Sequence, residues 1–431
     1  MEAAILSIVV FLVLIALGMN VGLSLMLVGV IGYAMVVTPA AAFGVLRSIP
    51  HSQASSYGLM VIPMFVLMGN FAYAAGLSTG LYNACNKWLS RLPGNLACGT
   101  MLASAGFGAI CGSVSATTAT MGSIAVPEMR KYGYADRLAT GSVAMGGTMG
   151  NLIPPSTLMI IYASIAEQSI GRLFAASIIP GIMTAVFSIF TISIMVLLIK
   201  GLAPAPHKTP WVERFKSLSG LVPVIVVFGI VLGGMFSGLF TVNQSSALGA
   251  VAAAVIWLVK GGVSWKIFTE VMAKSIRTTA MTFLIVVGAS VYGVFLNITG
   301  FPKILAVYIV GLDVSPFMVM FVMTIIYLIL GALMDEIPML VMTVPLFLPI
   351  VMGLGYDGIW FGAYVMLCMA MGVIAPPVGI ACFVLAGVVK EVPIQTIYRG
   401  AVPYLVTIMV VIACVVVWPD LCYFLPNLFF G

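Results

Sequence analysis

The sequence predicts an all-α membrane protein that crosses the bilayer many times and consists of two inverted repeats, each with a re-entrant helical hairpin and a broken transmembrane helix. Composition supports the membrane location: 62% of the 431 residues are hydrophobic and 7% are charged, against about 25% charged in soluble domains. A recurring motif supports the repeats. A shift of 222 residues carries Pro127 onto Pro349 and Pro154-Pro155 onto Pro376-Pro377.

The same shift aligns further positions, which strengthens the evidence for a duplication. It carries Gly133-Tyr134 onto Gly355-Tyr356, Gly150 onto Gly372 and Ser113 onto Asp335. Irregular backbone inside lipid persists only where protein buries it or where it lines a cavity. Paired interrupted segments in two halves of a chain are typical of the binding site of a secondary transporter. The repeats therefore predict a transporter.

Several other functions are disfavoured. The formal net charge of +6 is not concentrated in a basic stretch interleaved with aromatic residues, so no nucleic-acid partner is expected. The seven cysteines form no CxxC pair and the two histidines lie far apart, so no transition-metal site is expected. Because no GxxxxGKS/T nucleotide loop is present, no organic cofactor is expected, and energy must come from an ion gradient or a separate ATPase. No nucleophile–base pair is predicted at bilayer depth, which argues against an enzyme.

Apolar runs predict the spans of the first half. Residues 4–19 have no basic flank and no small-residue cleavage site, so they are interpreted as a retained span rather than a signal peptide. Residues 97–126 are long enough for two half-length helices that meet at a Ser/Thr/Gly tip, which predicts a re-entrant hairpin. The other predicted segments are spans at 21–38, 57–75 and 172–199, a polar loop with Arg47, His51 and Ser52, an amphipathic segment at 77–95 and a broken span at 138–166.

The second half is expected to repeat this order after a basic loop that runs from Lys200 to Lys216. A second hairpin is predicted at 315–350, with its turn at Gly331–Asp335. The other predicted segments are spans at 219–238, 243–259, 278–298 and 402–418, a second basic segment with Lys260, Lys266, Lys274 and Arg277, an amphipathic connector at 299–313 and a broken span at 359–388.

These segments divide the chain into five parts. Two transport repeats are expected at 57–166 and 278–388. Scaffold spans are expected at 1–56 and 389–431, and scaffold spans with basic interfacial arms at 167–277.

The distribution of Lys and Arg predicts the orientation in the membrane. If residues 87–91 face the cytoplasm and both hairpins re-enter, all 18 Lys and Arg lie on the cytoplasmic side except Arg47, Arg172 and Lys303. Both chain termini then lie outside. The first hairpin opens toward the cytoplasm and the second toward the outside, so the two repeats are predicted to be inverted.

The two breaks offer ligands for a cation. Proline lacks an N–H and clashes with the carbonyl four residues earlier, so the proline pairs should free four carbonyls, those of Gly150, Asn151, Gly372 and Val373. Unwound carbonyls coordinate sodium in transporters of this kind, and nearby hydroxyls complete neutral cages of hard oxygens. The first cage is assigned to Ser113, Gly147, Gly150, Asn151 and Pro154, and the second to Gly331, Asp335, Gly372, Ala375 and Pro376.

Asp335 is the one carboxylate predicted near the middle of the bilayer in the second hairpin, and Glu336 follows it directly. An acid inside a membrane is costly and is a functional candidate by default. The alternative is that Asp335 caps the second helix of the hairpin, and the two roles are compatible. Proton coupling would need titratable groups at the core, whereas the first hairpin's tip offers only hydroxyls. Sodium is therefore the preferred coupling ion.

Four stretches carry a resemblance to a known family. They read GSVSATTATMGSIAVPEM from Gly112, ATGSVAMGGTMGNLIPPS from Ala139, MDEIPMLVMTVPLFLPI from Met334 and MGVIAPPVGIACFVLAG from Met371. Over essentially the whole chain, the sequence resembles the large membrane subunit of tripartite ATP-independent periplasmic (TRAP) transporters, in the ion-transporter superfamily.

The resemblance implies an elevator-type transporter of the bacterial inner membrane with periplasmic termini. It implies sodium-coupled uptake of a small organic acid with two or more sodium ions, a separate small four-helix membrane partner and a periplasmic substrate-binding protein. By position, it assigns Ser113, Gly150 and Pro154 to the first sodium site, Gly372 and Pro376 to the second, and Ser115, Ser156 and Asp335 to the substrate.

The sequence departs from the family pattern at three places, which bear on the ligands and on substrate choice. It has GSVS at the first tip where the family usually reads GSGS or GSSV. Asn151 stands where an aliphatic residue often follows the glycine, and Ala375 stands where threonine is frequent before the second proline pair.

Two other functions stay open from the sequence. One is an autonomous sodium-coupled carrier that needs no binding protein. The other is a channel, although a channel uses a continuous pore lined by rings of carbonyls or charges. No Arg or Lys is predicted at the core to clamp a carboxylate, so a C4-dicarboxylate, a sugar acid such as sialic acid, a keto acid and a small sulfonate all remain possible substrates.

Overall fold

The computed structural model describes residues 2–206, 209–260, 264–312 and 314–431, and within these ranges the chain forms helices and no strand. Seven of these helices are long and apolar enough to cross a membrane, and an eighth span results if the bent pair Trp211–Gly220 and Val222–Phe236 counts as one. Large apolar side chains are exposed on the outer helices, for example Leu198 on α10 at 77% and Phe317 on α17 at 53%. The predicted all-α polytopic fold class is confirmed.

The helices of the first half follow the predicted order. They are α1 (Glu2–Ala16), α2 (Val21–Val36), α3 (Pro39–Ala54), the 3₁₀ turn η1 (Tyr57–Met60), α4 (Val61–Ala74), α5 (Leu77–Trp88), α6 (Asn95–Cys111), α7 (Val114–Lys131), α8 (Asp136–Leu152), α9 (Thr157–Ile165) and α10 (Ile170–Leu198).

The second half begins with short, interrupted helices and then repeats the order of the first. It contains α11 (Trp211–Ser217), η2 (Leu218–Gly220), α12 (Val222–Phe228), the π-helical turn η3 (Gly229–Gly233), α13 (Gly234–Phe236), α14 (Val242–Val259), α15 (Trp265–Thr299), α16 (Phe301–Val310), α17 (Pro316–Leu333), α18 (Glu336–Gly353), α19 (Gly358–Gly372), α20 (Ile380–Val388), α21 (Ile394–Val417) and α22 (Asp420–Phe430).

The 222-residue shift found in the sequence also relates the helices. Adding it to the start of α8 gives the start of α19, and both helices follow a glycine with positive φ, Gly133 at 81° and Gly355 at 92°. The turn bonds match as well: Tyr134 N–H donates to the Met129 carbonyl over 3.0 Å, and Tyr356 N–H donates to the Val351 carbonyl over 3.2 Å. This turn and the helix after it therefore recur 222 residues later, and the two inverted repeats stay a prediction.

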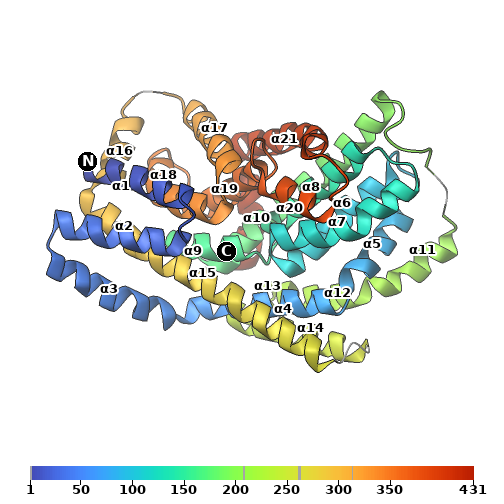
Figure 1. Ribbon diagram of the computed structural model, residues 1–431, viewed down its shortest axis with the longest axis horizontal. Coiled ribbons are helices and arrows are strands. Elements are labelled where there is room, and N and C mark those ends of the chain that lie inside the picture. Colours follow the sequence, from blue (N-terminus) through green and yellow to red (C-terminus); the bar gives the residue numbers. More distant parts are fainter. Residues whose placement is uncertain (1, 207–208, 261–263, 313) are drawn as a thin grey trace.

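Two fully buried helices form the centre of the molecule. Every residue of α19 is buried, and so is every residue of α8 from Leu138 to Leu152. The long helix α15 crosses the molecule diagonally below them (Figure 1) and packs along α2. Glycines bring these two backbones together, because a Cβ placed on Gly288 would lie 2.2 Å from the Gly22 carbonyl oxygen. Small residues permit such close packing in membranes.

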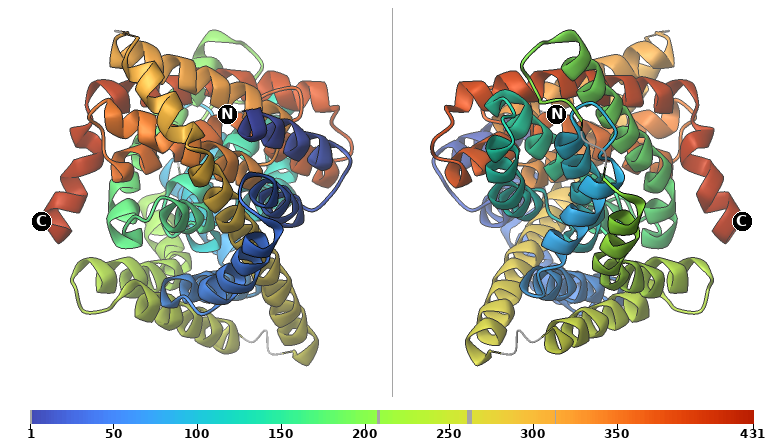
Figure 2. Two further views of the ribbon diagram at one scale, coloured as in Figure 1. Left: turned by 90° about the vertical axis from the view of Figure 1, so that its left-hand side faces the viewer. Right: turned by 90° about the vertical axis from the view of Figure 1, so that its right-hand side faces the viewer.

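The two repeats pack against one another crosswise. The second helix of hairpin 2, α18, contacts α9, which follows the first break, and the second helix of hairpin 1, α7, contacts α20, which follows the second break. The C-terminal helix α22 lies at the outer edge of the molecule (Figure 2), where it contacts α10. Each hairpin is therefore held partly by the other repeat.

The segment predicted as a polar loop around Arg47, His51 and Ser52 is instead the helix α3, so that prediction was wrong. The segment begins with two signals that favour a helix, and these decide its backbone conformation despite its polar residues. Thr38 caps the helix, with its Oγ1 accepting from Ala41 N–H over 3.2 Å, and proline occupies the first helical position, which suits its fixed φ.

The second basic segment is not separate from the span at 278–298. From Lys266 onward the segment belongs, with that span, to α15, a single helix of 35 residues, whereas Lys260 directly follows α14. No glycine or proline lies between Trp265 and Val287, so nothing in the chain interrupts the helix where its composition changes from basic to apolar. At residue 278, where the span was predicted to start, the composition changes from basic to apolar while the backbone stays helical.

Candidate functional site

The tip of hairpin 1 is a two-residue connection between α6 and α7. Gly112 ends α6 with a φ of 62°, a left-handed conformation that favours glycine. Ser113 then caps α7, with its Oγ accepting from Ala116 N–H over 3.4 Å. The tip therefore presents the N-terminus of α7, whose free N–H groups carry a partial positive charge.

This tip packs directly against the first break, which joins α8 to α9. A Cβ on Gly150 would lie 3.1 Å from the Ser113 carbonyl oxygen, and a Cβ on Gly112 would lie 3.1 Å from the Pro155 carbonyl oxygen and 3.6 Å from Ser156 Cα. A Cβ at either position would be in tight contact with the opposite backbone, so glycine favours this close approach. The structure thus brings Ser113 and Gly150, which the sequence analysis assigned to the first sodium site, close to Ser156, which it assigned to the substrate.

Three buried hydroxyls near this contact have no hydrogen-bond partner among the described residues: those of Thr117, Thr118 and Ser156. A Cβ on Gly147 would fall 1.9 Å from Thr118 Oγ1, so this hydroxyl lies against the backbone of α8. A buried hydroxyl without a partner is costly. The hydroxyls of Thr117, Thr118 and Ser156 are neutral oxygens, which fit a hard monovalent cation.

The first break leaves carbonyls free, as the prolines predict. α8 ends at Leu152, and outside the helix ladder no backbone N–H of the described chain donates to the carbonyl of Gly150 or Asn151. Pro154 is buried here. These carbonyls and the three unpartnered hydroxyls are therefore available to a ligand.

The Asn151 side chain joins the first break to hairpin 2. Its Nδ2 donates to Glu336 Oε2 over 2.6 Å, and Asn151 itself is 1% exposed. The sequence analysis assigned Asn151 to the first cage and named Glu336 only as the neighbour of Asp335. This hydrogen bond joins residues 185 positions apart, so the two halves of the chain are coupled at this point.

Hairpin 2 and the second break meet in the same manner as hairpin 1 and the first. A Cβ on Gly331 would lie 2.5 Å from Gly372 Cα, so these two backbones touch. Val378 N–H, just after the proline pair, donates to the Ala332 carbonyl over 3.0 Å. Gly331, Gly372 and Ala375 are buried, whereas Pro376 is exposed.

The carbonyls at the second break are not left free, which corrects the prediction. The Gly372 carbonyl accepts from Ala375 N–H and the Val373 carbonyl from Ala381 N–H, both over 3.0 Å. The chain turns tightly after α19, so new donors replace those that the prolines remove. Tyr398 on α21 adds a further bond by donating from its hydroxyl to the Val378 carbonyl over 2.7 Å. Each carbonyl still has a second lone pair for a ligand.

Asp335 caps α18, as the alternative reading proposed. Its Oδ1 accepts from Glu336 N–H over 2.7 Å, and the residue is exposed. Ser115 is also exposed, on α7 next to the first tip, whereas Ser156 is buried. No hydrogen bond joins Ser115, Ser156 and Asp335 to one another among the described side chains, so a substrate common to all three would have to bridge them.

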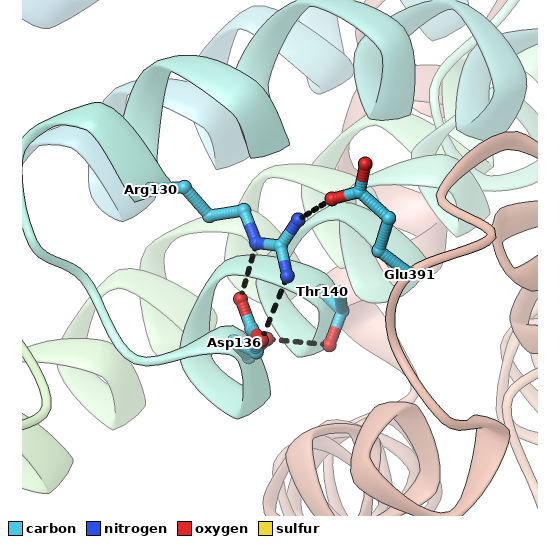
Figure 3. Close-up of polar contacts among 4 residues, drawn as sticks. All are labelled: Arg130, Asp136, Thr140 and Glu391. Carbon is cyan, nitrogen blue, oxygen red and sulfur yellow. Dashed lines mark hydrogen bonds and ion pairs between the residues drawn. The ribbon is translucent and has the colours of Figure 1, made fainter.

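An ionic cluster lies at the end of α7, the second helix of hairpin 1 (Figure 3). Arg130 at the end of α7 binds both carboxylate oxygens of Asp136, over 2.6 and 3.1 Å, and also reaches Glu391 in the loop between α20 and α21. Thr140 Oγ1 donates to the Asp136 carbonyl over 2.7 Å. Glu391 therefore links the loop that follows the second repeat to the first repeat.

The sequence analysis did not assign Glu336, Tyr398 or Thr118 to the candidate site, although all three contact one of the two breaks. Glu336 could have been found, because it is a second acid at the same hairpin tip and an acid in a membrane needs a partner. Thr118 belongs to the Ser/Thr cluster that marked the tip. Tyr398 left no local signal, because its role depends on how α21 packs against the second break.

Comparison with known proteins agrees with this architecture. Residues 8–421 match the family described as tripartite ATP-independent periplasmic transporter, DctM component. The chain is 29% identical over 415 residues to the sialic acid TRAP transporter large permease SiaM of Vibrio cholerae, covering 96% of both chains. It is 33% identical over 375 residues to the C4-dicarboxylate TRAP transporter large permease DctM of Pseudomonas aeruginosa, covering 86% of both.

A further relative is the isethionate TRAP transporter permease DctMQ of Oleidesulfovibrio alaskensis, 29% identical over 85% of this chain and 58% of that one. Among solved structures, the fold is similar to the YdaH transporter of Alcanivorax borkumensis, with a TM-score of 0.59 at 15% identity over 88% of this chain and 89% of that one. MtrF of Neisseria gonorrhoeae gives a TM-score of 0.60 at 13% identity over 90% and 85%. These structural neighbours bear on the fold alone.

The curated relatives are named as transporter permeases, in agreement with the expectation of a transporter rather than an enzyme. The family match extends over nearly the whole chain and includes both hairpins and both breaks. This multi-pass membrane protein therefore belongs to the DctM family, the large permease component of TRAP transporters.

Proposed function

We propose that this chain is the transport subunit of a sodium-coupled importer that moves a small organic acid, a carboxylate or a sulfonate, across the bacterial inner membrane. The observation that carries this proposal is the convergence of hairpin 1 and the first break. There the free carbonyls of Gly150 and Asn151 lie with buried hydroxyls that have no partner. Such a set of neutral oxygens matches the sodium sites of transporters built with broken helices.

The first sodium site would comprise Ser113, Gly147, Gly150, Asn151 and Pro154, and the second Gly331, Asp335, Gly372, Ala375 and Pro376. At each break, sodium would be held by carbonyls whose helix has ended. Ser115, Ser156 and Asp335 would contact the substrate. The N-termini of α7 and α18 would favour its negative charge.

Transport would follow an elevator mechanism with inverted repeats. Residues 57–166 and 278–388 would move as one element against the remaining spans and interfacial arms. Sodium and substrate together would close both tips before the movement.

The partners expected from the family are a small membrane subunit and a periplasmic substrate-binding protein, with the termini of this chain in the periplasm. The relatives are named as permeases for sialic acid, C4-dicarboxylates and isethionate, all of them small organic acids. A second candidate is an autonomous sodium-coupled carrier of the same acids.

Uptake into proteoliposomes tests the proposal. The vesicles would contain this chain with its small partner, and the binding protein would be added outside together with each candidate acid. Uptake that requires both an inward sodium gradient and the binding protein is expected. Uptake with sodium alone would favour the autonomous carrier, and uptake driven only by a proton gradient would contradict both sodium sites.

A further inference from the structure

Two cavities border the long helix α15, one beside each hairpin. The first, of about 570 Å³, lies between α4, α7 and the start of α15. The second, of about 480 Å³, lies between α9, α18 and the end of α15. The internal repeat relates them, because Ser123 of α7 lines the first and the residue 222 positions later, Pro345 of α18, lines the second. Either cavity has room for a small organic acid.

The two cavities differ in charge. The cavity beside α7 is lined by one cation, Lys274, together with Glu270 and with uncharged polar side chains such as Asn70, Thr120 and Ser123. The cavity beside α18 has one charged lining residue, Glu167. A carboxylate or sulfonate therefore finds a cationic partner beside hairpin 1 and none beside hairpin 2.

Lys274 is directed toward an aromatic face and makes no ion pair in the described chain. Its Nζ lies 5.3 Å from the centre of the Tyr73 ring. Glu270 lies one helical turn earlier on α15, yet no contact of 4.0 Å or less joins the two side chains. Lys274 is exposed to the cavity. Its ammonium group thus has three donors free for an anion.

The open face of α7 connects this cavity to the tip of hairpin 1. Exposed or half-buried residues follow one another along the helix at Ser115, Ala119 and Ser123, and all three have small side chains. Ser115 belongs to the proposed substrate site, and Ser123 lines the cavity. Eight residues of helix span about 12 Å. This distance exceeds the length of a C4-dicarboxylate or of isethionate, so such an acid would occupy the cavity and the hairpin tip in turn.

We propose that Lys274, in the cavity between α4, α7 and α15, forms a subsite for the carboxylate or sulfonate of the transported acid. This subsite lies about 12 Å along α7 from the tip of hairpin 1. The subsite rests on the proposed function for the identity of its ligand. Hydroxyl and amide groups of α4 and α7 donate to the rest of the acid. The ammonium group of Lys274 attracts the negative charge of the acid in this cavity. The sequence alone predicted Lys274 as part of an interfacial basic segment.

Lys266 provides a matched control. It belongs to the same helix and the same basic segment, is also exposed and does not line the cavity. An interfacial role common to both lysines predicts equal effects when either charge is removed. A subsite predicts an effect from Lys274 alone.

The first test measures the electrostatic potential in the cavity without any substrate. Ser123→Cys in the purified complex would be modified with a negatively and a positively charged thiosulfonate reagent, and the reaction of the native cysteines would be subtracted using the parent protein. Lys274→Gln is expected to lower the ratio of anionic to cationic reaction rates severalfold to about tenfold, as removal of a nearby unit charge predicts. Lys266→Gln is expected to change the ratio by less than about twofold.

The second test measures uptake of whichever probe the wild-type complex transports, chosen from sialic acid, a C4-dicarboxylate and isethionate. Lys274→Gln is expected to reduce uptake at least about fivefold, Lys274→Arg to retain it, and Lys266→Gln to leave it unchanged. Equal effects of the two Lys→Gln substitutions in both tests would overturn the subsite. A change in the labelling ratio in a protein that transports none of the acids would contradict the proposed function and leave the anion subsite supported.

Discussion

The hydrogen bond between Asn151 and Glu336 is the residue-scale feature that most constrains the mechanism. It joins the first break to the tip of hairpin 2 over 2.6 Å, in a part of the molecule where Asn151 is 1% exposed. A buried carboxylate that loses its donor keeps the full cost of leaving water. The pair therefore makes the position of hairpin 2 depend on the conformation of the first break.

An isosteric exchange of the pair tests this dependence. Asn151→Asp replaces the donating amide by a second acid and is expected to reduce uptake about 10- to 100-fold, because a buried acceptor left without its donor costs about 1–3 kcal/mol. Adding Glu336→Gln restores one carboxylate and one amide and is expected to recover much of the uptake. A double variant no more active than Asn151→Asp would contradict the pairing.

Asp335 allows its capping role to be separated from a functional role. Asp335→Ala is expected to abolish uptake while the complex still assembles, because loss of a cap costs only about 1 kcal/mol. Asp335→Ser retains a capping oxygen and lacks the carboxylate, so it is also expected to be inactive. The measurement is uptake together with the melting temperature of the complex.

Asp357 is the control for that experiment, because its Oδ1 caps α19 by accepting from Trp360 N–H over 2.7 Å. Asp357→Ala is expected to lose similar stability and to keep uptake. Full activity of Asp335→Ser would show that Asp335 serves as a cap and has no further role.

At the scale of elements, the two hairpins are held by contacts between backbones. Gly331→Ala would place a Cβ 2.5 Å from Gly372 Cα, and a backbone atom cannot rotate away. We expect a loss of about 1–3 kcal/mol from overpacking, seen as a lower melting temperature, together with loss of uptake. Gly387→Ala in α20 is the control, since nothing lies within 4 Å of its Cβ. Equal behaviour of the two variants would contradict the contact.

The proline pairs determine where α8 and α19 end. Replacing Pro154-Pro155 by Ala-Ala is expected to let α8 continue and to engage the Gly150 and Asn151 carbonyls in helical hydrogen bonds. The sodium concentration for half-maximal uptake is then expected to rise at least about tenfold. Pro127→Ala, inside α7 and away from the break, should leave it unchanged. An unaltered sodium response of the Ala-Ala variant would refute the first cage.

Most elements were predictable from the sequence because their ends carry strong local signals. The start of α8 follows the Gly133-Tyr134 turn. Gly112 lies in the tip of hairpin 1, and Asp335 lies in the tip of hairpin 2. The helix α3 and the full length of α15 were not predicted, because polar composition was taken as a sign of loop or interface. Composition reports what surrounds a segment, whereas capping and the absence of Gly or Pro decide its backbone.

The candidate site was predictable in its elements and less so in its bonds. The approach of Ser113 to Gly150 follows from the pairing of hairpin 1 with the first break. The donors that occupy the Gly372 and Val373 carbonyls come from a turn whose path the sequence does not specify. Contacts between the halves, such as that of Glu336 with Asn151, depend on how the repeats pack and leave no local pattern.

At the scale of the whole molecule, the two repeats are interlocked. Each hairpin contacts the helix that follows the other repeat's break, and Arg130 adds an ionic link from hairpin 1 to the loop after α20. The two proposed sodium sites and the proposed substrate residues are therefore parts of one connected structure. Binding at either break can influence both tips, which is the property that coupled transport requires.

The central claim is that sodium binding at the breaks drives entry of the organic acid. The most direct measurement is the influx of radioactive sodium and of labelled acid into the same proteoliposomes, with the small partner present and the binding protein outside. The account predicts that the acid stimulates sodium influx, with more than one sodium entering per acid, and that Pro154-Pro155→Ala-Ala lowers both fluxes. Entry of the acid without stimulated sodium influx would contradict it.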